Sequence, residues 1–203
     1  MYIPDIYKNE NHKEIIDFLK KNSFGILINQ NDGNILATHI PLEFELKENG
    51  KQFLEGHVSK ENPQWKTFKN DNRILAVFTG PHTYISSSWY DHENVPTWNY
   101  IAVIYGKVKI LNYQETILSL KKLVDKYESN SKNPLRIEDL SEKTMRQAKG
   151  IVAFQIEITS IEAVKKISQN RDQKNHQNII SELEKTEDHN ACQIAQEMAK
   201  NKK

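Results

Sequence analysis

A long stretch of alternating residues most constrains how this chain can fold. Every second residue from 36 to 46 is apolar or a threonine: Leu36, Thr38, Ile40, Leu42, Phe44 and Leu46. A period of two is typical of a β-strand with one buried face. Asp-Gly at 32–33 precedes the stretch and Asn-Gly at 49–50 follows it, and both dipeptides favour tight turns. Antiparallel strands are therefore expected, with a bend or a sheet edge at Pro41, which cannot donate to a ladder.

The remaining pattern adds strands and late helices. Short apolar runs predict further strands at 24–29, 52–59, 73–80, 98–112, 151–158 and 161–166. Apolar residues at helical spacing predict helices at 11–22, 113–128 and 138–148, a helical turn at 63–69, and two helices after residue 168. The fold class is therefore mostly β with helical additions, as a small antiparallel barrel. The expected domains are residues 1–170, with helices inserted at about 113–148, and a C-terminal helical extension at 171–203.

Composition excludes several classes of protein. The 203 residues carry 28 basic and 27 acidic side chains, a net charge of +1, which argues against a strongly basic nucleic-acid binder. The lysines of the two inserted helices alternate with acids, so a solvated face is expected there and direct DNA binding should be weak or absent. Cys192 is the one cysteine, so no internal disulfide forms. The first residues lack the apolar core of a signal peptide, and no apolar run is long enough for a membrane span. A cytoplasmic location without membrane contact is expected.

No standard catalytic motif is present, and no catalytic residue is identified. The sequence lacks a P-loop, G-x-G-x-x-G, G-x-S-x-G and H-E-x-x-H. His39, His57 and His82 are 18 and 25 residues apart, which is not a local metal-binding spacing, so no metal site is predicted. Each histidine taken alone is expected to be half-buried and bonded to backbone. Together they are more informative, because each lies beside a hydroxyl at a strand end or turn, where barrels bind ligands.

Residues 80–100 concentrate aromatic and hydroxyl side chains. Two Trp, three Tyr, two His and a run of three Ser occur within 21 positions. A flavin or a similar flat phosphate ester needs stacking rings for its plane and hydroxyls, amides and a cation for its phosphate. The tryptophans, here and at position 65, serve such stacking, core packing or a subunit interface.

Seven motifs in fixed order resemble one family. They are "MYIP" at the start, "ATHIPL" (37–42), "GHVSKENPQWK" (56–66), "GPHTYISSSWY" (80–90), "VPTWNY" (95–100), "YGKV" (105–108) and "ISQNR" (167–171). The chain resembles the PaiB family of FMN-binding negative transcriptional regulators over about residues 1–175. The resemblance implies an FMN-binding split β-barrel related to pyridoxamine-phosphate oxidases and flavin reductases. It also implies a bacterial homodimer with its ligand site at the subunit interface, and a link to repression of protease-synthesis and sporulation genes.

The same resemblance suggests where FMN is held. The loop after strand 52–59 corresponds to the phosphate-binding loop of split-barrel flavoproteins. The candidate cofactor-binding residues of this loop are His57, Ser59, Lys60 and Asn62. Thr38 and His39, on the strand before it, would lie beside them, and Arg171 near the C-terminus is a further candidate cation. Residues 80–100 would form a wall of the same cleft or an interface through His82, Tyr84, Ser86, Trp89 and Trp98.

Three other functions remain open at this point. A flavin-dependent oxidoreductase would let the flavin do the chemistry while the protein positions it. A haem-binding split-barrel protein would need an accessible axial histidine, for which His39, His57 and His82 are available. A direct DNA-binding repressor would use the helices at 113–128 and 138–148.

Overall fold

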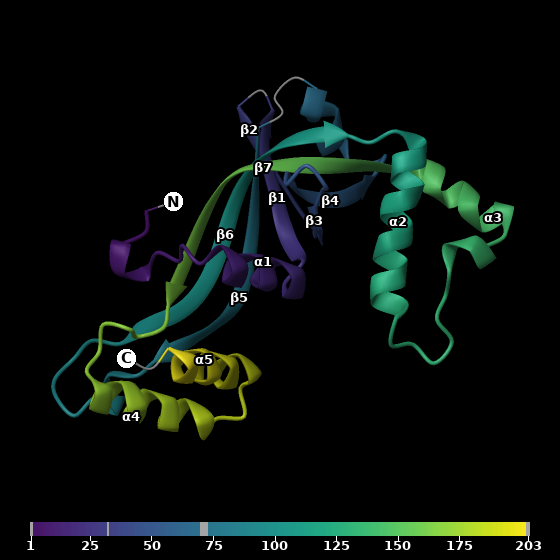
Figure 1. Cartoon of the computed structure of the whole chain (residues 1–203). Coiled ribbons are helices and arrows are strands. Elements are labelled where there is room, and N and C mark those ends of the chain that lie inside the picture. Colours follow the sequence, from purple (N-terminus) through teal and green to yellow (C-terminus); the bar gives the residue numbers. More distant parts are fainter. Residues whose placement is uncertain (1, 32, 70–72, 202–203) are drawn as a thin grey trace. The chain divides into compact units, whose positions relative to one another are not determined.

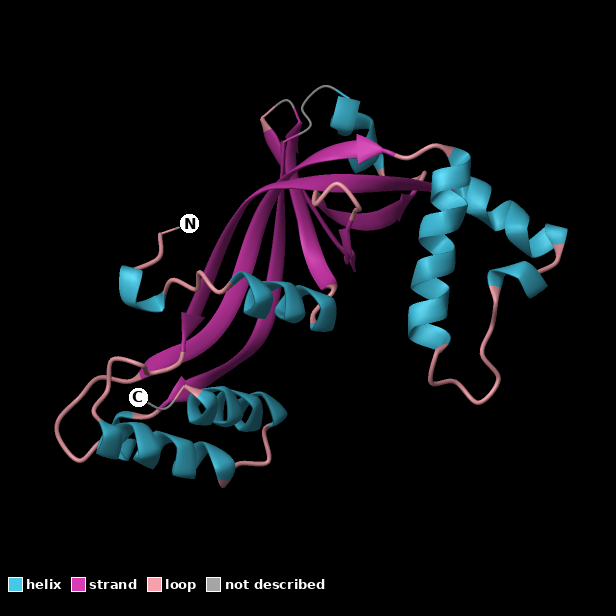
Figure 2. Cartoon of the chain, in the orientation of Figure 1, coloured by secondary structure: helices cyan, strands magenta, loops and turns pink. Residues whose placement is uncertain are grey.

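A computed structural model describes residues 2–31, 33–69 and 73–201. Within these ranges, seven strands form one sheet in the order β2-β1-β5-β6-β7-β4-β3 (Figures 1 and 2). The strands are β1 (Phe24–Asn31), β2 (Asn34–Pro41), β3 (Glu43–Leu46), β4 (Gln52–Ser59), β5 (Arg73–Ile85), β6 (Thr97–Ile110) and β7 (Ile151–Lys166).

Helices precede, interrupt and follow the strands. The α-helices are α1 (His12–Lys21), α2 (Tyr113–Glu128), α3 (Glu142–Met145), α4 (Gln173–Glu184) and α5 (His189–Lys200). Short 3₁₀ helices are η1 (Asp5–Tyr7), η2 (Pro63–Lys69), η3 (Ser87–Trp89), η4 (Ile137–Asp139) and η5 (Arg146–Gly150). In the part of the chain that the structure describes, no helix has both the length and the apolar content needed to cross a lipid bilayer.

The two expected turns are confirmed. β1 and β2 pair antiparallel up to Asn31 opposite Asn34, and Gly33 has φ +81°; Asp32 of this turn lies outside the described residues. In the second turn Gly50 has φ +77°, and its N–H donates to the Lys47 carbonyl at 2.9 Å. Glycine suits both positions because positive φ costs it no steric clash.

The break expected at Pro41 separates β2 from β3. The N–H of Leu42 leaves the β2 ladder and donates to the Ser23 carbonyl at 2.7 Å. The Leu42 side chain is completely buried, so the bend directs one residue of the alternating stretch fully into the core. The long apolar alternation is therefore divided between two strands, as the proline indicates.

The late helical region differs from the sequence prediction. A single helix over 138–148 is wrong: η4, α3 and η5 replace it, with Leu140 extended at ψ 137° and the Ser141 hydroxyl capping α3. Ile137 supplies the one fully buried side chain of η4, so little packing favours a continuous helix over these local caps. The two strands expected at 151–158 and 161–166 are one strand, β7.

The chain divides into two compact units. One comprises residues 19–77 and 104–161, and the other residues 1–18, 78–103 and 162–203. The 19–77/104–161 unit centres on buried Leu27, Leu54 and Phe154, with Phe68 edge-on to Phe154 at 5.2 Å between ring centroids.

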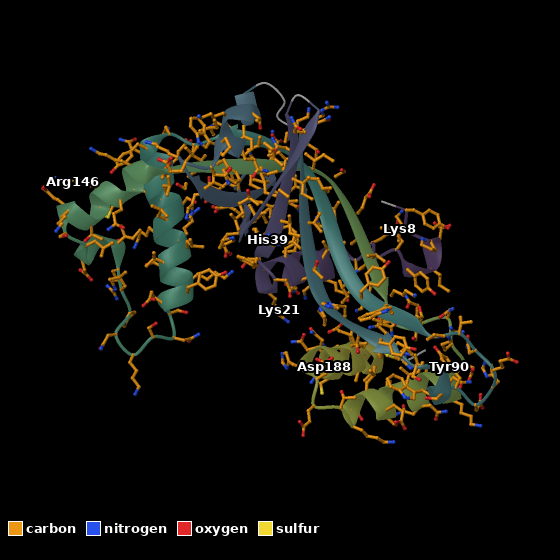
Figure 3. All side chains as sticks on the ribbon, turned by 180° about the vertical axis from the view of Figure 1, so that it is seen from behind. Lys8, Lys21, His39, Tyr90, Arg146 and Asp188 are labelled. Carbon is orange, nitrogen blue, oxygen red and sulfur yellow. The ribbon has the colours of Figure 1, made fainter. Side chains whose placement is uncertain are left out.

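The second unit has a helical core. α4 and α5 bury Ile179, Leu183 and Ile194 against Ile85 of β5 and Tyr90, and Figure 3 shows Tyr90 beside these two helices. The predicted tail helices are therefore packed elements rather than a loose tail.

Candidate functional site

The loop that follows β4 is a compact turn closed by its own backbone. The Asn62 N–H donates to the Ser59 carbonyl at 3.0 Å, and the Glu61 N–H donates to Ser59 Oγ at 3.2 Å. The Lys60 N–H donates to the Gly150 carbonyl at 2.9 Å, which ties the turn to the start of β7. Ser59 Oγ accepts within the turn, so its own O–H remains available to donate outward. The Ser59 and Lys60 side chains are both exposed.

A buried amide network fixes the far end of this loop. Asn62 Nδ2 donates to Thr38 Oγ1 at 3.0 Å, and the Thr38 hydroxyl donates to Gln64 Oε1. Gln64 is 1% exposed, and its Nε2 also lies 2.8 Å from Asn29 Oδ1 and 3.1 Å from the Leu27 carbonyl. The network therefore brings Thr38 and Asn62 together, as predicted, and commits most of their polar groups to holding the loop against β1 and β2.

His57 faces a small cavity between β3, β4 and α2. The cavity has a volume of about 180 Å³, and its lining includes Phe44, His57 and Leu123 together with Lys122 and Lys126. Burial lowers the pKa of His57, so its imidazole is neutral at pH 7 and presents one N–H. Residues 57 and 59 share one face of β4, because side chains alternate along a strand.

His39 lies apart from this network. It neighbours Thr38 on β2, so its side chain points to the opposite face, where it is exposed and stacks on Phe24 at 6.3 Å between ring centroids.

Residues 80–100 serve two different purposes. His82, Tyr84 and Trp98 form an exposed aromatic face on β5 and β6, with Trp98 6.2 Å from His82 and 6.1 Å from Tyr84 between ring centroids. Ser86 instead caps η3, because its Oγ accepts from the Ser88 N–H at 3.2 Å. Trp89 packs against the α4–α5 core. The first three residues are therefore exposed and in contact with one another, whereas Ser86 and Trp89 hold local structure.

Arg171 belongs to the other compact unit. Its guanidinium carbon lies 4.9 Å from the centre of the Tyr90 ring. The first six cofactor candidates, from Thr38 to Asn62, all belong to the 19–77/104–161 unit.

Comparisons with known proteins identify the family. Residues 1–160 match the family described as "Putative FMN-binding domain". The Bacillus subtilis (strain 168) protein named "Protease synthase and sporulation protein PAI 2" is 44% identical over 200 residues, which cover 98% of this chain and 96% of that relative. The chain belongs to the FMN-binding PaiB family. The cofactor assigned to the chain by this membership is FMN.

Solved structures confirm that this PaiB-family chain has the split β-barrel fold of flavin-binding proteins. The FAD- and haem-binding protein from Mycobacterium smegmatis matches with a TM-score of 0.63 and 15% identity, over 86% of this chain and 80% of that one. The flavocytochrome Anf3 from Azotobacter vinelandii matches with a TM-score of 0.64 and 13% identity, over 87% and 78%. At these identities the likeness is one of fold.

The β4 loop of this PaiB-family chain has a donor set that fits a phosphate group. The Ser59 O–H and the Lys60 ammonium are both exposed and uncommitted within the turn, and the neutral His57 supplies an N–H on the Ser59 face of β4. Hydrogen bonds from such donors to a charged phosphate oxygen are stronger than those between neutral groups. Asn62 contributes mainly by positioning the loop.

Sequence reasoning missed two parts of this region. Gln64 is the centre of the amide network, yet its only signal was its place in "ENPQW", directly after a turn. Lys122 and Lys126 reach the cavity from α2, and no local pattern places a helix 60 residues away against β4. Both depend on tertiary packing.

Proposed function

We propose that the protein is an FMN-binding homodimer that acts in negative transcriptional regulation of the protease-synthesis and sporulation type. The match to the Bacillus subtilis protein over nearly the full length of both chains carries this proposal. Bound FMN supplies a flavin ring capable of electron transfer. A transcriptional role places the protein in the cytoplasm.

In this proposal the β4 loop holds the FMN phosphate. The Ser59 hydroxyl and the His57 imidazole donate to phosphate oxygens, and Lys60 neutralises part of the phosphate charge. The Thr38–Asn62–Gln64 network keeps the turn in one geometry, so little order has to be gained when the anion binds. Residues 171–203 then form a helical extension of the FMN-binding domain.

The exposed aromatic face supports the homodimer. Tyr84 is 46% and Trp98 53% exposed, and Tyr100 is 37% exposed on the same strand as Trp98. Clustered exposed rings are typical of interfaces, because Tyr and Trp bury large apolar areas while keeping a polar atom accessible. A second copy of the chain would cover this face.

Ion pairs on α2 favour regulation without strong direct DNA binding. Lys121 pairs with Asp125 and Glu138, Lys122 with Glu45, and Lys126 with Glu43. Affinity for DNA depends on lysines and arginines that neutralise phosphates. The charge of a lysine that is already paired with an acid is largely neutralised, so it attracts a DNA phosphate weakly. The regulatory effect is therefore expected to pass through a ligand or another protein.

The absorbance spectrum of purified protein, followed by FMN titration, tests the proposal. Flavin bands that co-purify, or saturable FMN binding at micromolar concentration, are expected. Lack of FMN binding together with a Soret band on adding hemin would replace the proposal with haem binding. Turnover of reduced nicotinamide by the FMN-loaded protein would assign an oxidoreductase activity instead.

A further inference from the structure

The turn that joins β7 to α4 is held in a strained shape. Ser168 has φ +58°, which a non-glycine residue rarely adopts. Its Oγ accepts from the amide of Asn99 at 3.1 Å, and Asn99 is completely buried. Gln169 Oε1 accepts from the Ile167 N–H at 2.8 Å and braces the same turn. Strained backbone that several contacts enforce is concentrated at functional sites, and this turn delivers Arg171.

Arg171 brings a buried donor that has no partner. Among the described residues, nothing hydrogen-bonds to Arg171 Nε, although this atom is shielded from solvent. The guanidinium lies on the face of the Tyr90 ring, 4.9 Å from its centre, which fixes its orientation. Buried donors are nearly always paired in folded proteins, so this N–H is free to bind a ligand.

Lys166 is a second cation close to Arg171. Its ammonium donates to Thr97 Oγ1 and lies 5.7 Å from the centre of the Tyr7 ring. Burial lowers the pKa of Lys166, and the positive charge of Arg171 lowers it further. Within the described residues, neither cation has a carboxylate partner.

The adjacent Lys165, in contrast, has carboxylate partners within the same unit. It points to the other face of β7, where its ammonium bonds to Glu14 and Glu197. The acids near Arg171 are occupied elsewhere: Asp172 caps α4, and Asp91 pairs with Lys174. The Lys166–Arg171 pair therefore concentrates positive charge that the protein itself does not neutralise.

We propose that Lys166 and Arg171 form a binding site for an anionic group, a phosphate or a carboxylate, on a small-molecule ligand. Lys166 at the end of β7 and Arg171 in the turn that follows supply the charge, and the Tyr7 and Tyr90 rings flank them. The site lies in the unit made of residues 1–18, 78–103 and 162–203, whereas the β4 loop lies in the other unit. It does not depend on the FMN assignment to that loop.

Calorimetric titration of the full chain with inorganic phosphate and with malonate tests this site. Wild type should bind at least one of the two anions. Arg171→Gln and Lys166→Gln should bind it roughly ten- to a hundred-fold more weakly, the loss expected for one charge-assisted hydrogen bond. Lys185→Gln is the matched control: it removes the same charge from the C-terminal end of α4, where Lys185 pairs with Glu182, and its affinity should equal that of wild type.

Thermal melting separates binding from folding. Without the anion, Lys166→Met should melt at or above the wild-type temperature, because it removes a buried charge that Arg171 repels. The anion that binds should raise the melting temperature of wild type more than that of Lys166→Met. The proposal is overturned if wild type binds neither anion, or if Lys185→Gln loses as much affinity as Arg171→Gln.

Repeating the titration on FMN-saturated protein distinguishes the sources of the anionic group. If FMN saturation abolishes the part of anion binding that wild type has and Arg171→Gln lacks, the phosphate of FMN occupies the Lys166–Arg171 pair. If that part persists, a separate ligand uses the site.

Discussion

If the β4 loop holds the FMN phosphate as proposed, single side chains of this loop should decide whether the protein distinguishes FMN from riboflavin. Ser59→Ala and Lys60→Ala should each weaken FMN binding by roughly ten- to a hundred-fold, because each removes a donor to a charged phosphate worth about 1.5–3 kcal/mol. Riboflavin has no phosphate, so its affinity should change little. Fluorescence titration of both flavins measures the FMN-to-riboflavin affinity ratio.

Lys66→Ala is the control for these two variants, since it removes an exposed lysine from η2 and should leave the ratio unchanged. If the ratio is also unchanged in both Ser59→Ala and Lys60→Ala, the loop does not bind phosphate.

Lys165 should matter for stability rather than for binding. It is 7% exposed and bonds to Glu14 of α1 and Glu197 of α5. Lys165→Met leaves Glu14 without this cation and Glu197 paired with Lys200 alone, which should cost about 1–3 kcal/mol, below the full value for a buried pair because both acids are partly exposed. Urea unfolding at pH 7 measures the loss; Lys185→Met, at an exposed pair with Glu182, should lose less than about 1 kcal/mol.

The same ion pairs predict a pH window. Burial opposes ionisation of Glu197, but its bonds to Lys200 and Lys165 outweigh burial and lower its pKa. Burial likewise opposes the charge on Lys165, and its bonds to Glu14 and Glu197 outweigh it and raise the pKa. An acid whose pKa is lowered by folding stabilises the fold at pH values above its pKa in the unfolded chain. A lysine whose pKa is raised by folding stabilises the fold at pH values below its pKa in the unfolded chain. The difference in unfolding free energy between wild type and Lys165→Met should therefore be widest at about pH 5–10. A difference that is unchanged at pH 3 contradicts this account.

At the scale of elements, close packing of β6 against β7 requires a glycine. A Cβ at Gly106 would lie 2.3 Å from Ile156 Cγ2 and 3.0 Å from the Glu157 carbonyl oxygen. Gly106→Ala should therefore cost about 1–3 kcal/mol, as overpacking does. Gly150→Ala is the control, because nothing lies within 4 Å of a Cβ placed there. Comparing denaturant midpoints of the two variants checks the difference, and equal midpoints would contradict the packing described.

Elements set by local chemistry were predictable from the sequence. The turns at Gly33 and Gly50 were predictable because glycine readily adopts the positive φ that they have. Helix α2 matches its predicted range because Asn112 and Glu115 form a capping box at its start. The region 138–148 was mispredicted because helical spacing alone does not show that Ser141 starts a new cap. The Gln64 network and the Lys166–Arg171 pair were not predictable, since each joins residues far apart in sequence whose partners only the fold supplies.

At the scale of the whole molecule, the exposed aromatic face predicts a dimer. A stable dimer buries about 1,200–2,000 Å², and a charge at the centre of that area should disrupt it. Trp98→Glu should therefore convert a dimer into a monomer, as measured by light scattering at micromolar concentration. Leu118→Glu changes a comparably exposed apolar residue on α2 (59% against 53%) and should remain dimeric. A wild type of monomer mass would overturn the homodimer.

The second compact unit is formed by segments that the ribosome synthesises far apart in time. This unit combines residues 1–18 with 78–103 and with the last 42 residues, 162–203, and Glu14 reaches its partner Lys165 across 151 positions. Residue 165 is synthesised 151 positions after Glu14. Helix α1 therefore lacks this partner while the intervening chain emerges from the ribosome. Contacts of such long range slow folding and leave apolar surface uncovered in the interval. This unit should therefore reach its native structure only after residues 162–203 have left the ribosome, and chaperone demand should be greatest before that stage.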